Sequence, residues 1–190
     1  MLYVVRHGET APNVAGVFLG RADPPLTPLG VRQAAWLAAS LPRPDRVISS
    51  PLERARRTAD AFGAPVEVDE RWIELDYGAL EGVHPSSVPQ AVRDRWHTDI
   101  SYRPDGGESL SELGERVRAA CDDLAYDAIE KTVVVATHVS PVKAAVAWAL
   151  DVEDTVAGRL WVDDAGVARI EVGPQGPVLR SLNEHRSTAP

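Results

Sequence analysis

Cysteine is almost missing from this sequence, in which Cys121 is the only one among 190 residues. A single thiol excludes an internal disulfide, and the five histidines form no spacing typical of a zinc site. We therefore predict no metal and no cofactor. Cys121 falls on the apolar stripe of a predicted helix, which favours a place in the core over a catalytic role.

Long apolar runs are missing as well. The first apolar stretch, residues 2–5, is short and is followed at once by charge, so it is not typical of a signal peptide. No later run approaches the roughly 20 apolar residues that a membrane span needs. Together with the scarcity of cysteine, this predicts a cytoplasmic protein with no membrane partner.

Positive charge is in the minority, with 20 Lys and Arg against 28 Asp and Glu and a net charge of -8. Nucleic-acid binding depends on Lys and Arg surfaces, so we predict no nucleic-acid partner. Any phosphate that this protein binds must meet a locally basic pocket. At 44% hydrophobic residues, the chain is long enough for one buried core, which predicts a single domain over residues 1–190.

Short apolar strands alternate with helical patterns along most of the chain. The predicted strands are residues 2–5, 46–49, 66–68 and 132–137, and the predicted helices are residues 26–41, 52–62, 109–126 and 140–150. Polar and apolar residues alternate over residues 158–183, which indicates antiparallel strands at a sheet edge. The predicted fold class is α/β, a three-layer sandwich with a mostly parallel central sheet and antiparallel strands near the C-terminus.

Two helices share one start signal, a hydroxyl residue that can cap the helix followed by proline. At the start of the first helix, Thr27 is the predicted cap and Pro28 the first helical position, and Ser50 and Pro51 precede the second helix. By contrast, residues 75–107 hold several prolines and glycines among charges and aromatics, and they are predicted to form an excursion over the sheet.

Unusual polar residues follow three of the predicted strands. Arg6 and His7 follow the first strand, Arg54 lies in the first turn of the helix after the second, and His138 follows the late central strand. Ligands of open α/β sheets bind beyond the carboxyl ends of the strands. Helical side chains lean toward the N-terminus of their helix, so Arg54 can reach the anion that Arg6 meets.

This combination of side chains predicts chemistry on a phosphoryl group. Two guanidinium groups suit the oxygens of a phosphate, and a helix start such as the one after His138 favours anions. Neutral His7 can attack phosphorus while the cationic surroundings stabilise the phosphoryl oxygens, without a metal.

Five segments, in order along the chain, resemble the histidine phosphatase superfamily, which includes the cofactor-dependent phosphoglycerate mutases. They are RHGET with Asn13, LGRADPPLTPLGVRQA, SSPLERARRTA, ELDYGALEG and the final His138. The resemblance implies a phosphoglycerate mutase-like fold. The stretch THVSPVKAA is more similar to the acid phosphatase and α-ribazole phosphatase-like domains of actinobacterial proteins than to the mutases.

The resemblance also implies a role for each matching residue. His7 is the phosphorylated nucleophile, Glu74 the proton donor and His138 the third catalytic residue. The substrate phosphate is bound by Arg6, Asn13 and Arg54. Many relatives have glycine after the second histidine, where this chain has Val139, which should narrow the pocket there.

The function predicted from these residues is metal-independent hydrolysis of a small phosphorylated metabolite through a phosphohistidine intermediate. Two alternatives stay open: a phosphoglycerate mutase, and a non-catalytic module that binds phosphate or a phosphoprotein. Glu81 and Glu9 are rival proton donors, and Trp96, Tyr102 and Arg103 could equally contact the leaving group or pack onto the sheet. The family resemblance also suggests a homodimer.

Overall fold

The computed structural model describes residues 1–185, apart from the side chain of His97. Residues 186–190, which the single-domain prediction includes, lie outside the described part. One mixed sheet of six strands runs through the molecule in the order β3-β2-β4-β1-β5-β6. The strands are β1 (Leu2–Arg6), β2 (Arg46–Ser49), β3 (Val66–Val68), β4 (Val133–Thr137), β5 (Val167–Gly173) and β6 (Gly176–Glu184).

The direction of the strands confirms the predicted fold class. β1 to β4 pair in parallel, whereas β5 pairs antiparallel with both β1 and β6. The central pair puts Arg6 opposite Thr137, so the carboxyl ends of β1 and β4 meet at one edge of the sheet. The residues that follow these two strands, His7 and His138, therefore emerge side by side.

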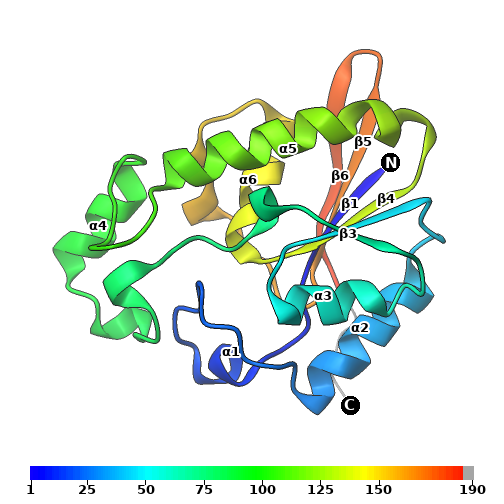
Figure 1. Ribbon diagram of the computed structural model, residues 1–190. Coiled ribbons are helices and arrows are strands. Elements are labelled where there is room, and N and C mark those ends of the chain that lie inside the picture. Colours follow the sequence, from blue (N-terminus) through cyan, green and yellow to red (C-terminus); the bar gives the residue numbers. More distant parts are fainter. Residues whose placement is uncertain (186–190) are drawn as a thin grey trace.

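Helices cover both faces of the sheet (Figure 1). α5 (Leu110–Glu130) and α6 (Val139–Leu150) pack together on one face, and α2 (Pro28–Ser40) and α3 (Glu53–Asp60) lie on the other. Alternation along the strands explains the two layers, since Leu2 and Val4 belong to one core cluster and Tyr3 and Val5 to the other. No helix in residues 1–185 has the length and apolarity to cross a bilayer.

The cap predicted for α2 is confirmed, but the one predicted for α3 is wrong. Thr27 accepts a hydrogen bond from the Gly30 N–H at 3.0 Å. Ser50 instead continues the pairing of β2, because its N–H donates to Ala136 O, and α3 begins only at Glu53. The Ser50 hydroxyl contacts His138 and also accepts a hydrogen bond from the Leu52 N–H at 3.3 Å.

Several boundaries also differ from the sequence prediction. α5 continues four residues past the predicted end at Tyr126, because the buried Ala128 extends its apolar stripe. A five-residue helix, α1 (Ala11–Ala15), follows β1 where none was predicted. In the C-terminal stretch, the alternating pattern before Asp163 forms no strand, and a 3-10 turn, η4 (Asp154–Arg159), lies there instead.

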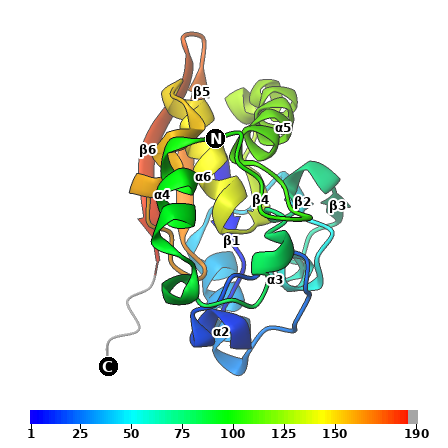
Figure 2. The ribbon, with the colours of Figure 1, turned by 90° about the vertical axis from the view of Figure 1, so that its left-hand side faces the viewer.

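The excursion contains short helical segments rather than strands. They are η2 (Gly78–Leu80), η3 (Pro85–Ser87) and α4 (Gln90–Thr98), and η1 (Glu70–Trp72) comes just before the excursion. Figure 1 shows α4 at the left edge of the molecule, and Figure 2, seen from that side, shows α4 facing the viewer. α4 also contacts η4, so the excursion is packed against the layer formed by α5 and α6.

Candidate active site

His7 lies directly after β1 and is buried, with 2% of its surface exposed. Its Nδ1 lies 2.7 Å from Gly8 O, and its Nε2 accepts a hydrogen bond from Arg54 Nε at 3.2 Å. Since a carbonyl can only accept, Nδ1 carries the proton and Nε2 presents a lone pair. Burial, and then the charges of Arg54 and Arg6, lower the pKa of His7 well below its usual value, so the ring is neutral.

Arg54 is fully buried at the start of α3 and connects His7 to the loop before α2. Its two terminal nitrogens donate to Ala22 O at 2.6 Å and to Gly20 O at 2.8 Å, while Asp23 lies 3.4 Å away. The carbonyl contacts hold the guanidinium in one orientation. The structure thus brings Arg54 into direct contact with His7, whereas its contact with a bound anion stays a prediction.

His138 caps the N-terminus of α6 and is fully buried. Its ring centroid lies 5.1 Å from that of His7, and its Nε2 lies 2.7 Å from the Ser50 hydroxyl oxygen. Burial, followed by the charges of Arg54 and His7, lowers the pKa of His138 well below its usual value. Its Nδ1 is a buried polar atom with no hydrogen-bond partner among the described residues, which is uncommon in native structures.

Glu74 is a buried carboxyl group, 2% exposed, on the segment between η1 and η2. Its Oε1 accepts from the Leu75 N–H at 2.7 Å and from the Ser140 N–H at 3.3 Å. Burial raises the pKa of Glu74 above its usual value, although these two N–H groups and the charge of Arg54 act against it. A carboxyl with a raised pKa can stay protonated and donate a proton.

The two rival carboxyl groups have other partners. Glu81 accepts hydrogen bonds from the Gly20 and Arg21 N–H groups, at 2.9 Å each. Glu9 accepts one from the Thr27 hydroxyl at 2.7 Å. Both carboxylates thus hold loop backbone or a helix cap in place, which favours Glu74 as the proton donor.

The structure ties Arg6 and Asn13 to neighbouring loops. Arg6 forms an ion pair with Asp164 at 2.8 Å and donates to Val162 O, yet its charge still acts on the pKa of His7, His138 and Glu74. Asn13 Oδ1 accepts from the N–H and hydroxyl of Thr10. Phosphate binding by Arg6 and Asn13 stays a prediction.

A match along nearly the whole sequence establishes the family of this chain. The family model described as "Histidine phosphatase superfamily (branch 1)" matches residues 2–185. This chain belongs to the histidine phosphatase superfamily. The resemblance seen in the sequence is thereby confirmed.

Three members of the superfamily and of its fold illustrate the similarity. "Bifunctional protein Rv2228c" of Mycobacterium tuberculosis is 36% identical over 187 residues, which cover 92% of this chain and 51% of that protein. "Putative phosphoserine phosphatase 2" of Hydrogenobacter thermophilus is 33% identical, covering 96% of this chain and 95% of the relative. A phosphoserine phosphatase variant from Entamoeba histolytica, solved with phosphoserine, has a TM-score of 0.89 at 27% identity and 96% coverage of both chains. The chain spans about half the length of the first curated relatives that it matches.

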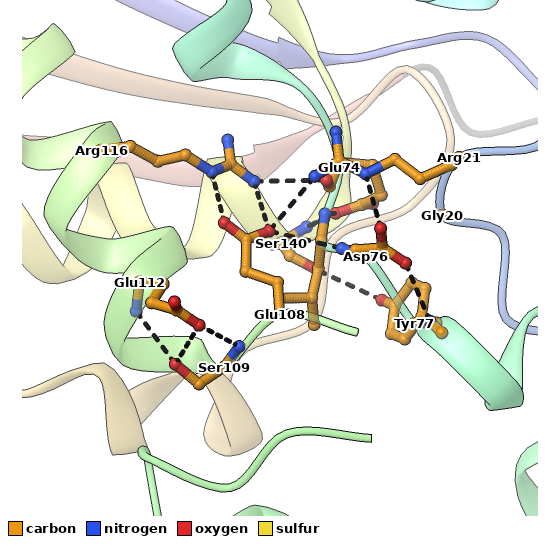
Figure 3. A network of polar contacts seen from close by, with 12 residues as sticks. Gly20, Arg21, Glu74, Asp76, Tyr77, Glu108, Ser109, Glu112, Arg116 and Ser140 are labelled. Atoms are coloured by element: carbon orange, nitrogen blue, oxygen red, sulfur yellow. Dashed lines mark hydrogen bonds and ion pairs between the residues drawn. The ribbon is translucent and has the colours of Figure 1, made fainter. Parts of the chain in front are cut away.

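A polar network that joins motif residues to Arg116 and Glu108, which lie outside the motifs, positions the Glu74 segment (Figure 3). Arg116 of α5 donates to Arg71 O at 2.6 Å and to Glu74 O at 3.2 Å, and it pairs with Glu108 at 2.7 Å. Arg21 contacts the same Glu108 at 3.5 Å. The loop that holds Arg54 and the segment that carries Glu74 are therefore linked through one carboxylate.

Sequence reasoning missed several of these residues. Arg116 stands on an ordinary amphipathic helix, where an arginine is usually solvated. Ser50 was interpreted as a helix cap, whereas it contacts His138. Val139 packs against the core as the first residue of α6. Within residues 1–185, no three His, Cys, Asp or Glu side chains come together as a metal site would require.

Proposed function

We propose that this protein is a metal-independent phosphatase that hydrolyses a small phosphomonoester through a phosphohistidine at His7. The observation that carries the proposal is the state of His7, a neutral ring whose Nε2 lone pair faces a buried guanidinium. A nucleophile held beside the cation that will bind the phosphoryl oxygens suits in-line transfer. The names of two of the relatives compared above, both phosphoserine phosphatases, support a phosphatase.

In the first step, His7 Nε2 attacks phosphorus and the bond from phosphorus to the ester oxygen breaks. The departing oxygen takes the proton of Glu74, so the products are the free alcohol, phosphohistidine and the Glu74 carboxylate. Arg54, Arg6 and His138 face the developing charge on the phosphoryl oxygens, with Asn13 as an accessory ligand. Two arginines supply the positive charge that a metal ion would otherwise provide.

In the second step, water attacks the phosphohistidine. The Glu74 carboxylate accepts a proton from this water, the bond from phosphorus to Nε2 breaks, and inorganic phosphate leaves. His7 is again neutral and Glu74 is again protonated. One carboxyl group thus serves as acid and then as base, which requires a pKa near the working pH.

The proposed intermediate is tested by rapid acid quench and alkaline quench with 32P-labelled substrate. We expect a phosphoryl adduct that is labile in acid and stable in alkali, and its absence in His7→Ala. Turnover of p-nitrophenyl phosphate should fall by about 10³-fold or more in that variant, while exposed His84→Ala serves as the matched control. An alkali-labile adduct, or an adduct that persists in His7→Ala, would assign the nucleophile to another residue.

Two further assays separate this function from its alternatives. EDTA should leave the rate unchanged, whereas activation by divalent ions would contradict the metal-independent mechanism. A mutase would transfer phosphate between phosphoglycerates and respond to a bisphosphoglycerate primer, whereas a phosphatase releases phosphate without an acceptor. A binding module would bind vanadate and release no phosphate.

The cytoplasmic location and the homodimer are further parts of the proposal. Cys121, the one cysteine, is buried, and burial raises the pKa of its thiol, which suits a structural residue in a reducing compartment. Cell fractionation tests the location. Light scattering during gel filtration tests the dimer.

A further inference from the structure

A cavity of about 290 Å³ lies beside Glu74, between the excursion and the layer of α5 and α6. Most of its wall is apolar, and the main contributors are Phe18, Leu75, Tyr77, Trp96, Leu110 and Leu113. Three aromatic rings form one side of it. The ring centroids of Phe18 and Tyr77 lie 4.9 Å apart, and that of Trp96 lies 5.5 Å from Phe18.

The position of this cavity fits the leaving group of a substrate. Leu75 and Ser140 both line it, and their N–H groups are the two that bind the Glu74 carboxyl. Figure 3 shows Tyr77 and Ser140 next to Glu74, and the Tyr77 hydroxyl lies 3.2 Å from the Ser140 hydroxyl. An ester oxygen that receives the Glu74 proton would therefore carry its alcohol group into this cavity.

Two cations line the cavity, and one of them has no polar partner. Arg93 donates to Pro85 O at 3.2 Å and to Gln90 Oε1. Lys143 lies three residues after Ser140 on α6 and lines the cavity, yet no ion pair or hydrogen bond within the described part of the chain includes its ammonium group. The carboxylate that also lines the cavity, Asp154, is already bound to Arg118 at 2.7 Å. Burial lowers the pKa of Lys143, while the nearby charge of Glu74 raises it. A half-buried ammonium group beside apolar walls gains from an anionic partner.

Resting on the proposed phosphatase activity, we propose that the preferred substrate is the phosphate ester of an aromatic alcohol that carries a carboxylate, with the ring against Trp96 and Tyr77 and the carboxylate on Lys143. The volume is at the low end of ligand pockets, which span roughly 300–1,000 Å³, so it suits one ring better than a nucleotide. Aromatic rings contact one another at centroid distances of roughly 4.5–7 Å, as the wall residues already do. A small polar alcohol would leave the apolar walls exposed to water.

Matched esters test the proposal. The esters 4-carboxyphenyl phosphate and 4-carbamoylphenyl phosphate have similar size and leaving groups but differ by one charge. We expect kcat/KM to favour the carboxylate by about tenfold, and to favour both aryl esters over phosphoserine. Lys143→Met should bring the ratio close to one and Lys143→Arg should preserve it. The control is Lys131→Met, whose ammonium group pairs with Asp127.

The aromatic wall is tested in the same way. Trp96→Ala should lower kcat/KM for both aryl esters by about tenfold and change phosphoserine much less, whereas exposed Trp161→Ala should change neither. A carboxylate preference that survives Lys143→Met, or a preference for phosphoserine over both aryl esters, would overturn the proposal.

A binding experiment separates this inference from the activity on which it rests. Calorimetry with 4-carboxybenzylphosphonate and benzylphosphonate, which have no ester bond to hydrolyse, measures what the carboxylate adds to binding in the absence of turnover. The carboxylate should lower Kd by about tenfold in the wild type and not in Lys143→Met. If no ester releases phosphate, the proposed activity is wrong, and the ratio of the two Kd values then tests by itself whether the cavity binds a carboxylate. Equal Kd values would overturn the inference, even in an active phosphatase.

Discussion

At the residue scale, the two histidines and Arg54 could be predicted because each stands next to a strong local signal. His7 and His138 follow apolar strands, and Arg54 lies in the first turn of a helix. The partners of Arg54 could not be predicted, since Gly20 and Ala22 contribute backbone carbonyls from a loop without periodicity. A carbonyl is present at every position, so no residue type marks it.

Lys143 was missed for a different reason. It is the only charged side chain between Val139 and Leu150, in an otherwise apolar helix. That pattern indicates a face of α6 that is neither buried in the core nor fully exposed to solvent. The sequence alone does not show that an excursion some 50 residues earlier closes over this face.

Glu74→Gln is expected to separate alkyl from aryl substrates. A general acid contributes about 10²- to 10⁴-fold, so kcat on an alkyl phosphate should fall within that range. With p-nitrophenyl phosphate the loss should be much smaller, because the phenolate leaves without a proton. The pKa of Glu74 is raised by burial, and a bound phosphate dianion adds to this, so wild-type activity should extend to neutral pH and fall as Glu74 ionises.

The measurement is kcat/KM against pH for both substrates in wild type and variant. The alkaline limb on the alkyl phosphate should disappear in Glu74→Gln. The control is Glu81→Gln, which removes a carboxylate that binds the Gly20 N–H. Equal losses on both substrates, with the alkaline limb retained, would assign the proton to Glu81 or another group.

At the element scale, long periodic helices and buried strands could be predicted, and short or dual-purpose segments could not. α2 starts at the predicted cap because the Thr27 hydroxyl accepts from the Gly30 N–H while it donates to Glu9, so its second contact does not compete with the cap. Ser50 carries the same signal ahead of α3, but its N–H donates to Ala136 O of β4 and its hydroxyl contacts His138. Local propensity cannot decide which of two partners a hydroxyl takes.

A close approach between α2 and the loop after β1, which carries His7, supports that loop. A Cβ at Gly30 would lie 2.2 Å from Glu9 O, and one at Gly8 would lie 2.3 Å from Gly30 O. Both backbones therefore come closer than any side chain allows. The glycine in α2, which lowers its intrinsic helix propensity, is explained by this contact.

Gly30→Ala should consequently destabilise the protein, although alanine normally favours a helix by up to about 1 kcal/mol over glycine. Overpacking of this kind costs about 1–3 kcal/mol, and the displaced loop should also lower kcat. Urea unfolding and phosphatase assays measure the two effects. Val31→Ala, at an exposed site on the same helix, is the control. A gain in stability in Gly30→Ala would show that the two backbones separate without cost.

At the scale of the whole molecule, the order of elements predicts which edge of the sheet holds the site. Parallel strands end at the same edge, so the residues after β1, β2 and β4 meet there wherever the loops run. The path of the excursion over that edge was predicted only in outline. The contacts of Phe18, Tyr77 and Trp96 join segments far apart in sequence, and no single segment specifies them.

Burial of two neutral histidines between these layers predicts how stability depends on pH. His7 and His138 both have a lowered pKa in the folded protein, so below about pH 6.5 the unfolded chain binds more protons. Stability should therefore fall as the pH drops below about 6.5, by at most about 2 kcal/mol per histidine at pH 5. Glu74 opposes this trend, because its raised pKa lets the folded state bind the extra proton above about pH 4.3.

His138→Gln isolates the histidine contribution, since glutamine can still bond to Ser50 and does not titrate. The free energy of unfolding in urea, measured between pH 7.5 and 5 without phosphate in the buffer, should fall less steeply in this variant than in the wild type. His84→Gln, at an exposed site, should keep the wild-type slope. Acid loss from the carboxylates with lowered pKa, such as Asp69 and Glu67, begins at lower pH and does not interfere. A wild-type slope in His138→Gln would mean that the folded protein protonates His138 as readily as the unfolded chain does, which would contradict its burial as a neutral ring.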